Sequence, residues 1–530
     1  MLAEGEVEAP TFPPMVAANC STALGRAVPH SPRRARALRV LGAAVLLAGC
    51  AGRPGLMPTP RIYTGAGARP LFTGPPPPTT SLDLLYVTDR VPVTTPDGSF
   101  AYSSDRSRSM AFGSVTVDIG EQVPWPVLAQ QSTESKRELA LELRLGAVTE
   151  LGRFPPIPYD VDPVPGGITR SSATVDVHQR AAAGLQAEVA RRIAAAPRKE
   201  VVLFVHGYAN TFEDAAFKMA DLCHFLGREF VCGIFSWPAG GSRGMMAGYN
   251  VDRESGEFAV EHLKQAIRLI AQTPGVERIH LMAHSRGADV LASALRELNI
   301  EAYIGGDSVA DRFRLKNIVL LAPDIDADVA AAKIFSVVSD PDLAYGAAPQ
   351  PRKVFSGPGV HITAYVSSSD KALTLSQFLF GSLVRLGRVD VAQLRTEQVA
   401  KAARLAYLVD FIEVKGTRDF LGHSYFTSDP AASSDMVALI RYGLKPGEPG
   451  RPLEEIRRPF WRIPAEVLPE RAITNVGSPT RVPSRSPATV RGARRPTSTT
   501  VGSGSISPTT ASPAPPSARS RSPARRSTTS

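Results

Sequence analysis

The chain has 530 residues, of which 43% are apolar and 21% are charged, so it can bury a sizeable globular core. Its 60 Lys and Arg exceed its 50 Asp and Glu by ten, an excess that by itself would suit a protein that binds nucleic acid or an anionic membrane. Four cysteines are too few for a disulfide scaffold and match no zinc-site spacing, and no apolar run reaches the ~18 residues of a membrane-spanning helix.

Residues 1–49 have the features of an export signal. Four arginines between positions 33 and 39 precede a short apolar segment, residues 40–48. Leu47-Ala48-Gly49-Cys50 resembles the lipobox of bacterial lipoproteins, in which the cysteine is lipidated and becomes the mature N-terminus. We therefore expect Cys50 to anchor the protein to a membrane of the cell envelope, facing the periplasm or the exterior. About 30 residues precede the arginines, more than a usual signal has, so we expect a start codon assigned too far upstream.

Residues 50–80 are rich in proline and small side chains, which predicts a tether between the lipid anchor and the first domain. In an exported protein, Cys223 and Cys232 remain in a compartment that permits disulfides. We expect two buried free thiols there, with a disulfide between them as the alternative.

The predicted globular domain, residues 81–445, opens with an antiparallel entry region. Its predicted strands have alternating or β-rich patterns and cover residues 82–88, 111–119 and 137–145. A proline-rich connection at 155–167 and a helix at 178–195 follow.

From residue 201 onward, apolar strands alternate with amphipathic helices. The predicted strands are 201–205, 230–235, 279–282, 318–321, 361–366 and 410–414. The predicted helices are 212–226, 257–271, 287–298, 326–338, 371–380 and 432–442. This alternation predicts the α/β class with a mostly parallel, doubly wound sheet.

Two further segments follow this domain. Residues 446–470 form an extension in which Pro459-Phe460-Trp461 could pack back on the domain. Residues 471–530 contain ten arginines and no Lys, Asp or Glu, so this tail alone carries the excess of positive charge. Its other residues are mostly small or polar, which predicts disorder. Residues 1–470 are neutral, and we expect no specific nucleic-acid partner.

The predicted strand at 279–282 runs into Ala283-His284-Ser285-Arg286-Gly287, after which a helix begins. This is the small-x-Ser-x-small pattern of a nucleophile elbow, with alanine in the first small position. The sharp turn needs small residues two before and two after the serine because bulkier ones would clash with neighbouring backbone. We expect Ser285 to be the nucleophile; a helix-capping serine is the alternative.

An elbow serine needs a base and an acid that follow it in the order Ser, Asp or Glu, His. Among the histidines after Ser285, His361 begins a strand at the wrong end of the sheet, whereas His423 follows the last strand. His423 is therefore the predicted base. Asp370 is the preferred acid because it follows the strand at 361–366; Asp324 and Asp326 follow the preceding strand and are the alternatives.

The oxyanion hole should consist of backbone N–H groups. One comes from the residue after the nucleophile, Arg286, and the other from the loop His206-Gly207-Tyr208-Ala209-Asn210 after the first parallel strand. Tyr208 is the predicted second donor, with Ala209 as the alternative.

Several segments together resemble a bacterial family of uncharacterised, esterase- and lipase-like α/β hydrolases. The segments are LLYVTDR (84–90), YSSDRSRSMAFGSVTVDIG (102–120), VVLFVHGYANTFEDAAFKMADL (201–222), FSWPAGG (235–241), DRESGE (252–257), IHLMAHSRGADVL (279–291), LLAPDID (320–326), YVSSSDKAL (365–373) and GHSYF (422–426). The resemblance implies an α/β-hydrolase fold with a Ser-His-Asp triad and says little about the substrate.

The sequence thus predicts a serine hydrolase of carboxylic esters that works through an acyl-enzyme on a small ester or lipid-like substrate, without cofactor or metal. A catalytically silent envelope binding protein on the same fold is one alternative. A peptidase or thioesterase that uses the same triad is the other. The oligomeric state stays open.

Overall fold

The computed structural model describes residues 54–65, 67–75, 79–241, 245–339, 360–374, 385–415 and 422–464. The predicted signal region, Cys50 and the predicted basic tail lie outside the described residues. No helix within these ranges is both long enough and apolar enough to cross a bilayer.

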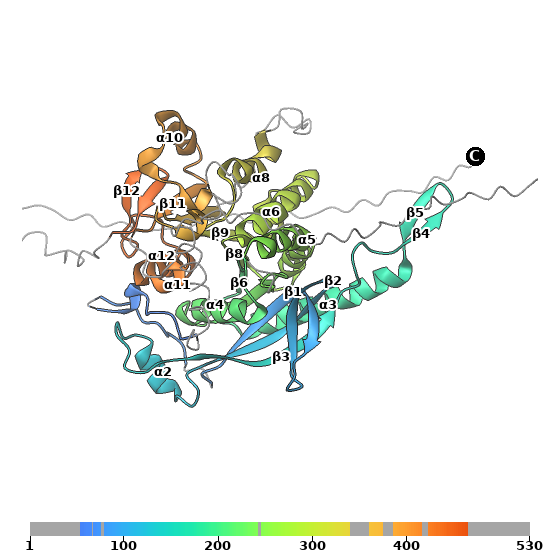
Figure 1. The fold of residues 1–530 in the computed structure, drawn as a ribbon, viewed down its shortest axis with the longest axis horizontal. Helices are drawn as coiled ribbons and strands as arrows, with labels where there is room; N and C mark the ends of the chain where they lie inside the picture. Colours follow the sequence, from blue (N-terminus) through green and yellow to red (C-terminus); the bar gives the residue numbers. More distant parts are fainter. Residues whose placement is uncertain are drawn as a thin grey trace, which may run out of the picture. The chain divides into compact units, whose positions relative to one another are not determined.

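One sheet of 11 strands runs through the domain (Figure 1). Its parallel strands, in their order across the sheet, are β13 (Phe460–Arg462), β11 (Val409–Glu413), β10 (His361–Val366), β9 (Leu315–Leu321), β8 (Arg278–His284), β6 (Glu200–Val205), β7 (Val231–Ser236) and β1 (Leu82–Thr94). Antiparallel strands extend both ends: β12 (Glu454–Arg457) beside β13, and β2 (Phe100–Ile119) and then β3 (Leu143–Arg153) beside β1.

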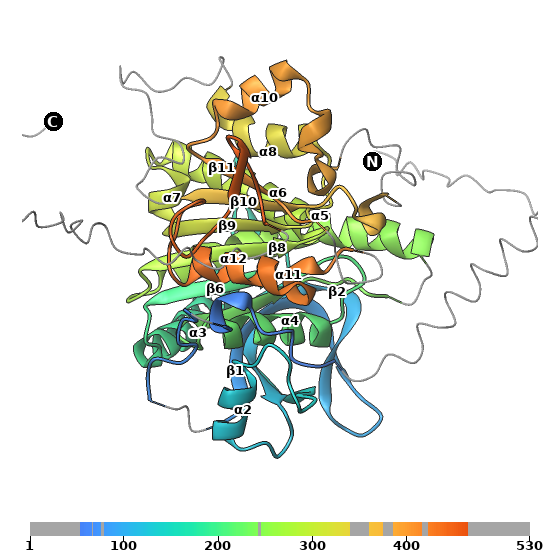
Figure 2. The same cartoon turned by 90° about the vertical axis from the view of Figure 1, so that its left-hand side faces the viewer.

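Helices cover both faces of this sheet. One face packs against α3 (Ser172–Ala195), α5 (Met245–Gln272), α6 (Gly287–Ile304) and α8 (Ala327–Ser339). The other packs against α4 (Phe212–Phe225), α11 (Tyr425–Ser428) and α12 (Pro430–Ile440), which lie together in front of the sheet in Figure 2. Shorter elements complete the domain: η2 (Arg61–Tyr63), α2 (Trp125–Gln131), α7 (Val309–Arg312), η3 (Leu386–Arg388), η4 (Val391–Gln393) and α10 (Thr396–Ala403).

Strand β6 illustrates why apolar runs form the centre of the sheet. Val201, Leu203 and Val205 pack in the core on the α5 side, whereas Val202 and Phe204 pack in the core on the α4 side. Because side chains alternate between the two faces of a strand, a strand covered on both sides must be apolar at every position. The predicted parallel, doubly wound sheet is therefore confirmed.

The chain reverses direction across the sheet at β6. From β6 it continues to β7 on one side and later returns to β8 on the other side. Such a reversal leaves a crevice at the carboxyl ends of the two central strands, where ligands of α/β proteins usually bind.

The entry region differs from its prediction at the third strand. β3 covers Leu143–Arg153, so the strand predicted at 137–145 is wrong. The side-chain oxygen of Gln131 accepts hydrogen bonds from the backbone amides of Glu138 and Leu139, at 3.0 and 3.4 Å, which holds this stretch out of the sheet.

Other segments also differ from their predicted bounds. The predicted connection at 155–167 contains the first strand of an exposed hairpin, β4 (Val161–Val164) and β5 (Gly167–Arg170), which stands away from the main sheet in Figure 1. Helix α5 begins at Met245 rather than at residue 257. Of the helix predicted at 371–380, only residues 371–374 are described, and they are helical.

The predicted tether is wrong for the residues that the structure describes. Leu56, Met57, Tyr63 and Leu71 are buried against the α4 side of the sheet. The Tyr63 hydroxyl donates to the carbonyl of Phe225 at 2.6 Å. Apolar side chains scattered among prolines are enough to fix this segment, so the folded domain includes residues 54–65 and 67–75, ahead of its predicted start at 81.

The extension at the other end also belongs to the domain. The packing of Phe460 and Trp461 is confirmed, since β13 pairs in parallel with β11 and Trp461 Nε1 donates to Asp410 Oδ1 at 2.8 Å. The sheet is therefore completed by strands from both ends of the described chain.

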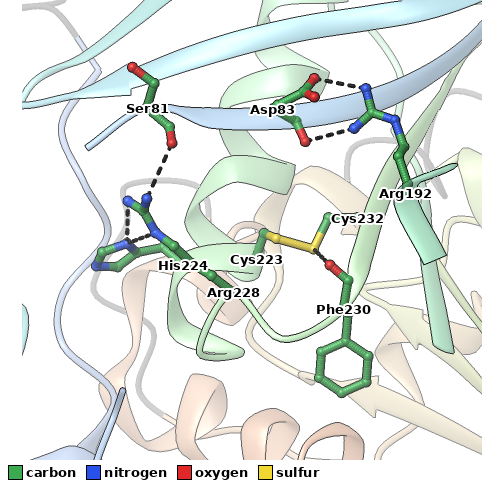
Figure 3. Close-up of a disulfide and its surroundings, with 8 residues drawn as sticks. All are labelled: Ser81, Asp83, Arg192, Cys223, His224, Arg228, Phe230 and Cys232. Atoms are coloured by element: carbon green, nitrogen blue, oxygen red, sulfur yellow. Dashed lines mark hydrogen bonds and ion pairs between the residues drawn. A yellow bond between two sulfur atoms is a disulfide. The ribbon is translucent and has the colours of Figure 1, made fainter. Parts of the chain in front are cut away.

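Cys223 at the end of α4 and Cys232 in β7 form a disulfide (Figure 3). The expectation of two free thiols is wrong. A short connection, residues 226–230, returns the chain from the helix to the neighbouring strand and brings the two Cα atoms to 6.1 Å, within the range that a disulfide spans.

Reducing this disulfide should lower the free energy of unfolding by about 2–3 kcal/mol, because the bond closes a loop of nine residues in the unfolded chain. Urea denaturation of the oxidised and the reduced protein, which share every side chain, measures the difference. Coincident denaturation curves would contradict the expectation.

Candidate active site

Ser285 lies on the turn between β8 and α6 and has a φ of 54°, in the left-handed region that residues other than glycine rarely adopt. Two backbone hydrogen bonds hold this turn. Ser285 N–H donates to the carbonyl of Leu321 at 2.9 Å, and the Ser285 carbonyl accepts from the amide of Asp324 at 3.0 Å. The end of β9 and its following loop thus stabilise a strained conformation, as an elbow requires.

Glycines allow close approach on both sides of this turn. A Cβ on Gly287 would lie 2.3 Å from the carbonyl oxygen of His206, which is closer than real Cβ atoms come. A Cβ on Gly207 would lie 2.7 Å from Cβ of Ser285. The loop after β6 therefore packs directly against the elbow, where an oxyanion hole is expected.

His423 and Asp370 are hydrogen-bonded to each other. His423 Nδ1 lies 2.7 Å from Asp370 Oδ2, and the Asp370 side chain is fully buried whereas 15% of the His423 side chain is exposed. The other carboxylate oxygen, Oδ1, accepts from the amide of Leu373 at 2.9 Å. Asp370 thus caps the helical turn that follows it and also binds the histidine.

The carboxylates of the two alternative acids bind other groups. Asp324 accepts from the Tyr249 hydroxyl at 3.1 Å and forms an ion pair with Arg385. Asp326 Oδ1 accepts from the amides of Asp328 and Val329 and caps the start of α8. These contacts correspond to the structural roles that such aspartates often have.

His284 connects the elbow with the loop that carries His423. Its Nε2 lies 3.2 Å from the carbonyl oxygen of His423, and the centroids of the two rings are 4.8 Å apart. Burial holds the pKa of His284 well below its usual value, so the ring is neutral and its single N–H is on Nε2, facing that carbonyl. Sequence reasoning missed this contact, although His284 stands inside the elbow motif.

The candidate oxyanion donors lie at the start of α6 and in the loop after β6. Arg286 is the N-cap of α6, where backbone N–H groups have no partner within the helix. The amide of Ala209, the alternative donor in this loop, donates to Asp252 Oδ2 at 3.0 Å, and Tyr208 stays the predicted donor. The Arg286 side chain is buried and pairs with Asp289 at 2.7 Å, which offsets its charge.

A metal site is not seen among the described residues, where no three His, Cys, Asp or Glu side chains converge as a metal ion would require. Ser285, the His423–Asp370 pair and the two loops with candidate donors all follow the carboxyl ends of strands. They lie at the edge of the sheet where ligands of α/β proteins usually bind.

Residues 181–441 match the family described as alpha/beta hydrolase of unknown function (DUF900). This description agrees with the α/β-hydrolase fold of the sheet and its helices. The match starts within α3 and ends just after α12, so strands β1–β3 and β12–β13 of the α/β-hydrolase sheet lie outside it. A search of curated proteins finds no match.

Solved structures similar to the α/β-hydrolase domain include several esterases at low identity. Carboxylesterase CesB from Bacillus subtilis is 12% identical, with 47% of this chain and 85% of that chain covered and a TM-score of 0.22. An inhibited esterase B from Lactobacillus rhamnosis is 14% identical, with 35% and 62% covered and a TM-score of 0.20. A predicted CIB-like hydrolase from Thermoplasma acidophilum is 16% identical, with 46% and 87% covered and a TM-score of 0.24. We base the fold assignment on the sheet topology and the family match.

Proposed function

We propose that the α/β-hydrolase domain is a serine hydrolase that cleaves carboxylic esters through an acyl-enzyme at Ser285. The observation that carries the proposal is a serine at a left-handed strand–helix turn, beside a loop whose His423 binds a buried carboxylate at 2.7 Å. Holding a non-glycine residue in this conformation costs on the order of 1–3 kcal/mol. A binding protein would gain nothing from that strain, whereas a nucleophile needs it to present its hydroxyl.

In the proposed reaction, His423 takes the proton of the Ser285 hydroxyl while Oγ attacks the ester carbonyl carbon. Asp370 accepts the hydrogen bond from Nδ1–H of His423 and stabilises the imidazolium that forms. The amides of Arg286 and Tyr208 donate to the oxyanion, and each such donor contributes about 3 kcal/mol of transition-state stabilisation. The leaving alcohol takes the proton from His423, and water then cleaves the acyl-enzyme by the same steps.

The same groups could cleave a thioester or an amide, because the choice of leaving group depends on the pocket rather than on the triad. We favour a small ester or lipid-like substrate on the resemblance of the sequence to esterase- and lipase-like proteins. Matched p-nitrophenyl esters, thioesters and anilides of graded acyl length would rank the three classes by kcat/KM. Turnover of esters that Ser285→Ala abolishes would support the proposal, and a wild-type protein inert towards all three classes would refute it.

We further propose that the enzyme is exported and anchored through Cys50. The disulfide between Cys223 and Cys232 supports an oxidising compartment, because structural disulfides are rare in the cytosol. Wild-type protein should partition into the detergent phase and incorporate radiolabelled palmitate, and Cys50→Ala should do neither. Equal partitioning of the two proteins would contradict the lipid anchor.

A further inference from the structure

Two charged residues have no part in the reaction proposed above, although both lie in segments that carry the resemblance to esterase-like hydrolases. Arg90 comes from the TDR segment in β1, and Asp252 comes from the DRESGE segment in α5. Both side chains are buried, Arg90 fully and Asp252 to all but 3%. A buried charge is costly unless it is matched by hydrogen bonds, so their contacts are informative.

Arg90 binds backbone carbonyls of the two loops that follow the central strands. Its guanidinium donates to the carbonyl of Asn210 at 2.8 Å, in the loop after β6, and to the carbonyl of Ala239 at 2.9 Å, in the loop after β7. Further bonds reach Ser236 Oγ at 2.9 Å and the Ser103 carbonyl at 3.1 Å. Burial lowers the pKa of Arg90 to about 10, which leaves the side chain charged at neutral pH.

Asp252 binds amides of the same two loops. Its Oδ2 accepts from the amide of Ala209 at 3.0 Å and from the amide of Gly240 at 3.3 Å. Ala209 has a φ of 55° and Gly240 a φ of 89°, so both amides belong to left-handed positions that an extended loop would not adopt. A Cβ on Gly240 would lie 3.0 Å from the Asn210 carbonyl oxygen, which shows how closely the loops approach.

Together the two residues bind both kinds of backbone group, carbonyl and amide, in the loop of residues 206–210. Arg90 binds the carbonyl of residue 210 and Asp252 binds the amide of residue 209. In the loop after β7, Arg90 likewise binds the carbonyl of residue 239 and Asp252 the amide of residue 240. Rotating either peptide would break a bond to a buried charge, which costs more than breaking a neutral hydrogen bond. The residue immediately before this pair of anchors is Tyr208.

We propose that Arg90 and Asp252 are positioning residues that fix the loop of residues 206–210, so that the backbone amide of Tyr208 points at the oxyanion. This inference rests on the proposed function. It assigns a task to two charges that lie 162 positions apart in the sequence and that neither contact the nucleophile nor belong to the triad. Because stabilisation by an oxyanion hole depends on fixed donor geometry, a loosened loop should reduce kcat rather than raise KM.

The test compares Arg90→Met and Asp252→Asn with matched controls away from these loops. Arg192→Met removes another buried arginine, which bonds Asp83 and Glu188 on the α3 side. Asp221→Asn replaces another buried helical aspartate, whose Oδ1 accepts the amide of Met57 at 2.9 Å. The Asp252→Asn change keeps the size of the side chain, so it carries the test if Arg90→Met does not fold.

Three measurements separate positioning from a merely structural role. Hydrogen exchange at peptides covering 206–211 and 237–241 should become about tenfold faster in both test variants and stay unchanged in the controls. The kcat for p-nitrophenyl butyrate should fall about 100-fold with KM within about threefold. Affinity for a trifluoromethyl ketone, whose adduct with a serine resembles the tetrahedral intermediate, should fall in parallel with kcat.

Two results would overturn the inference. Unchanged exchange in the two loops would show that the charges do not fix them, and this readout needs no catalytic activity. Faster exchange with unchanged kcat and inhibitor affinity would show that the loop does not carry an oxyanion donor. A wild-type protein without esterase activity would instead refute the proposed function and, with it, the catalytic half of the inference, whereas the exchange data would still decide the structural half.

Discussion

Ser285→Ala should lower kcat for p-nitrophenyl esters by about 10⁵- to 10⁶-fold, because the variant loses the nucleophile and retains only binding and the oxyanion donors. The fold should not change, since alanine fits wherever this serine fits and the turn is held by backbone hydrogen bonds to Leu321 and Asp324. The measurement is the steady-state rate across a range of ester concentrations, together with labelling by a fluorophosphonate probe that reacts only with an activated serine.

Ser433→Ala is the matched control for this change. Ser433 is a buried serine in α12 whose hydroxyl donates to the carbonyl of Asp429 at 3.2 Å, so its loss removes one hydroxyl elsewhere in the domain. Wild type and Ser433→Ala should both be labelled and active. Residual turnover of more than about 1% in purified Ser285→Ala would mean that another group is the nucleophile.

Asp370→Asn should lower kcat by about 10⁴-fold with little change in KM. The amide N–H of asparagine would donate to Nδ1 of His423, which moves the ring proton to Nε2 and prevents the histidine from accepting the proton of Ser285. Stability should be nearly unchanged, because asparagine caps a helix about as well as aspartate does and can still accept from the Leu373 amide.

The alternative acids supply the controls for this second prediction. Asp324→Asn and Asp326→Asn keep the size of the side chain at positions that bind Tyr249, Arg385 and the start of α8. Each should retain turnover within about threefold of the wild type, since neither change alters the proton on His423. A large loss in Asp324→Asn together with normal turnover in Asp370→Asn would transfer the role of the acid to Asp324.

Much of this arrangement could be predicted because it depends on local patterns. Apolar runs such as β6 mark strands buried on both faces, and their ends mark the edge where functional side chains gather. Asp370 and His423 could be selected as acid and base because each follows one of the successive strands after the elbow. Strand order favoured Asp370 over Asp324 but left Asp324 as an alternative, because both follow a parallel strand and the sequence does not show the direction of their side chains.

The contacts that sequence reasoning missed join distant parts of the chain. His284 binds a carbonyl 139 residues later, and Arg90 binds carbonyls about 120 and 149 residues later. An arginine that bonds backbone oxygens leaves no periodic signal, since its partners can be residues of any type. The disulfide was not predicted for a related reason. Two cysteines nine residues apart are compatible both with a bridge between a helix and the next strand and with two separate buried thiols.

The way the two ends of the domain meet has a consequence for the timing of folding. The amide of Ile62 donates to Ser434 Oγ, and the Tyr63 hydroxyl accepts from Arg441, across separations of 372 and 378 residues. Contacts of such long range form late, because the intervening chain must first be synthesised and the loop between them closed. The chain must be synthesised beyond residue 441 before these contacts can form, so the two ends of the domain join only after the sheet strands between them have left the ribosome.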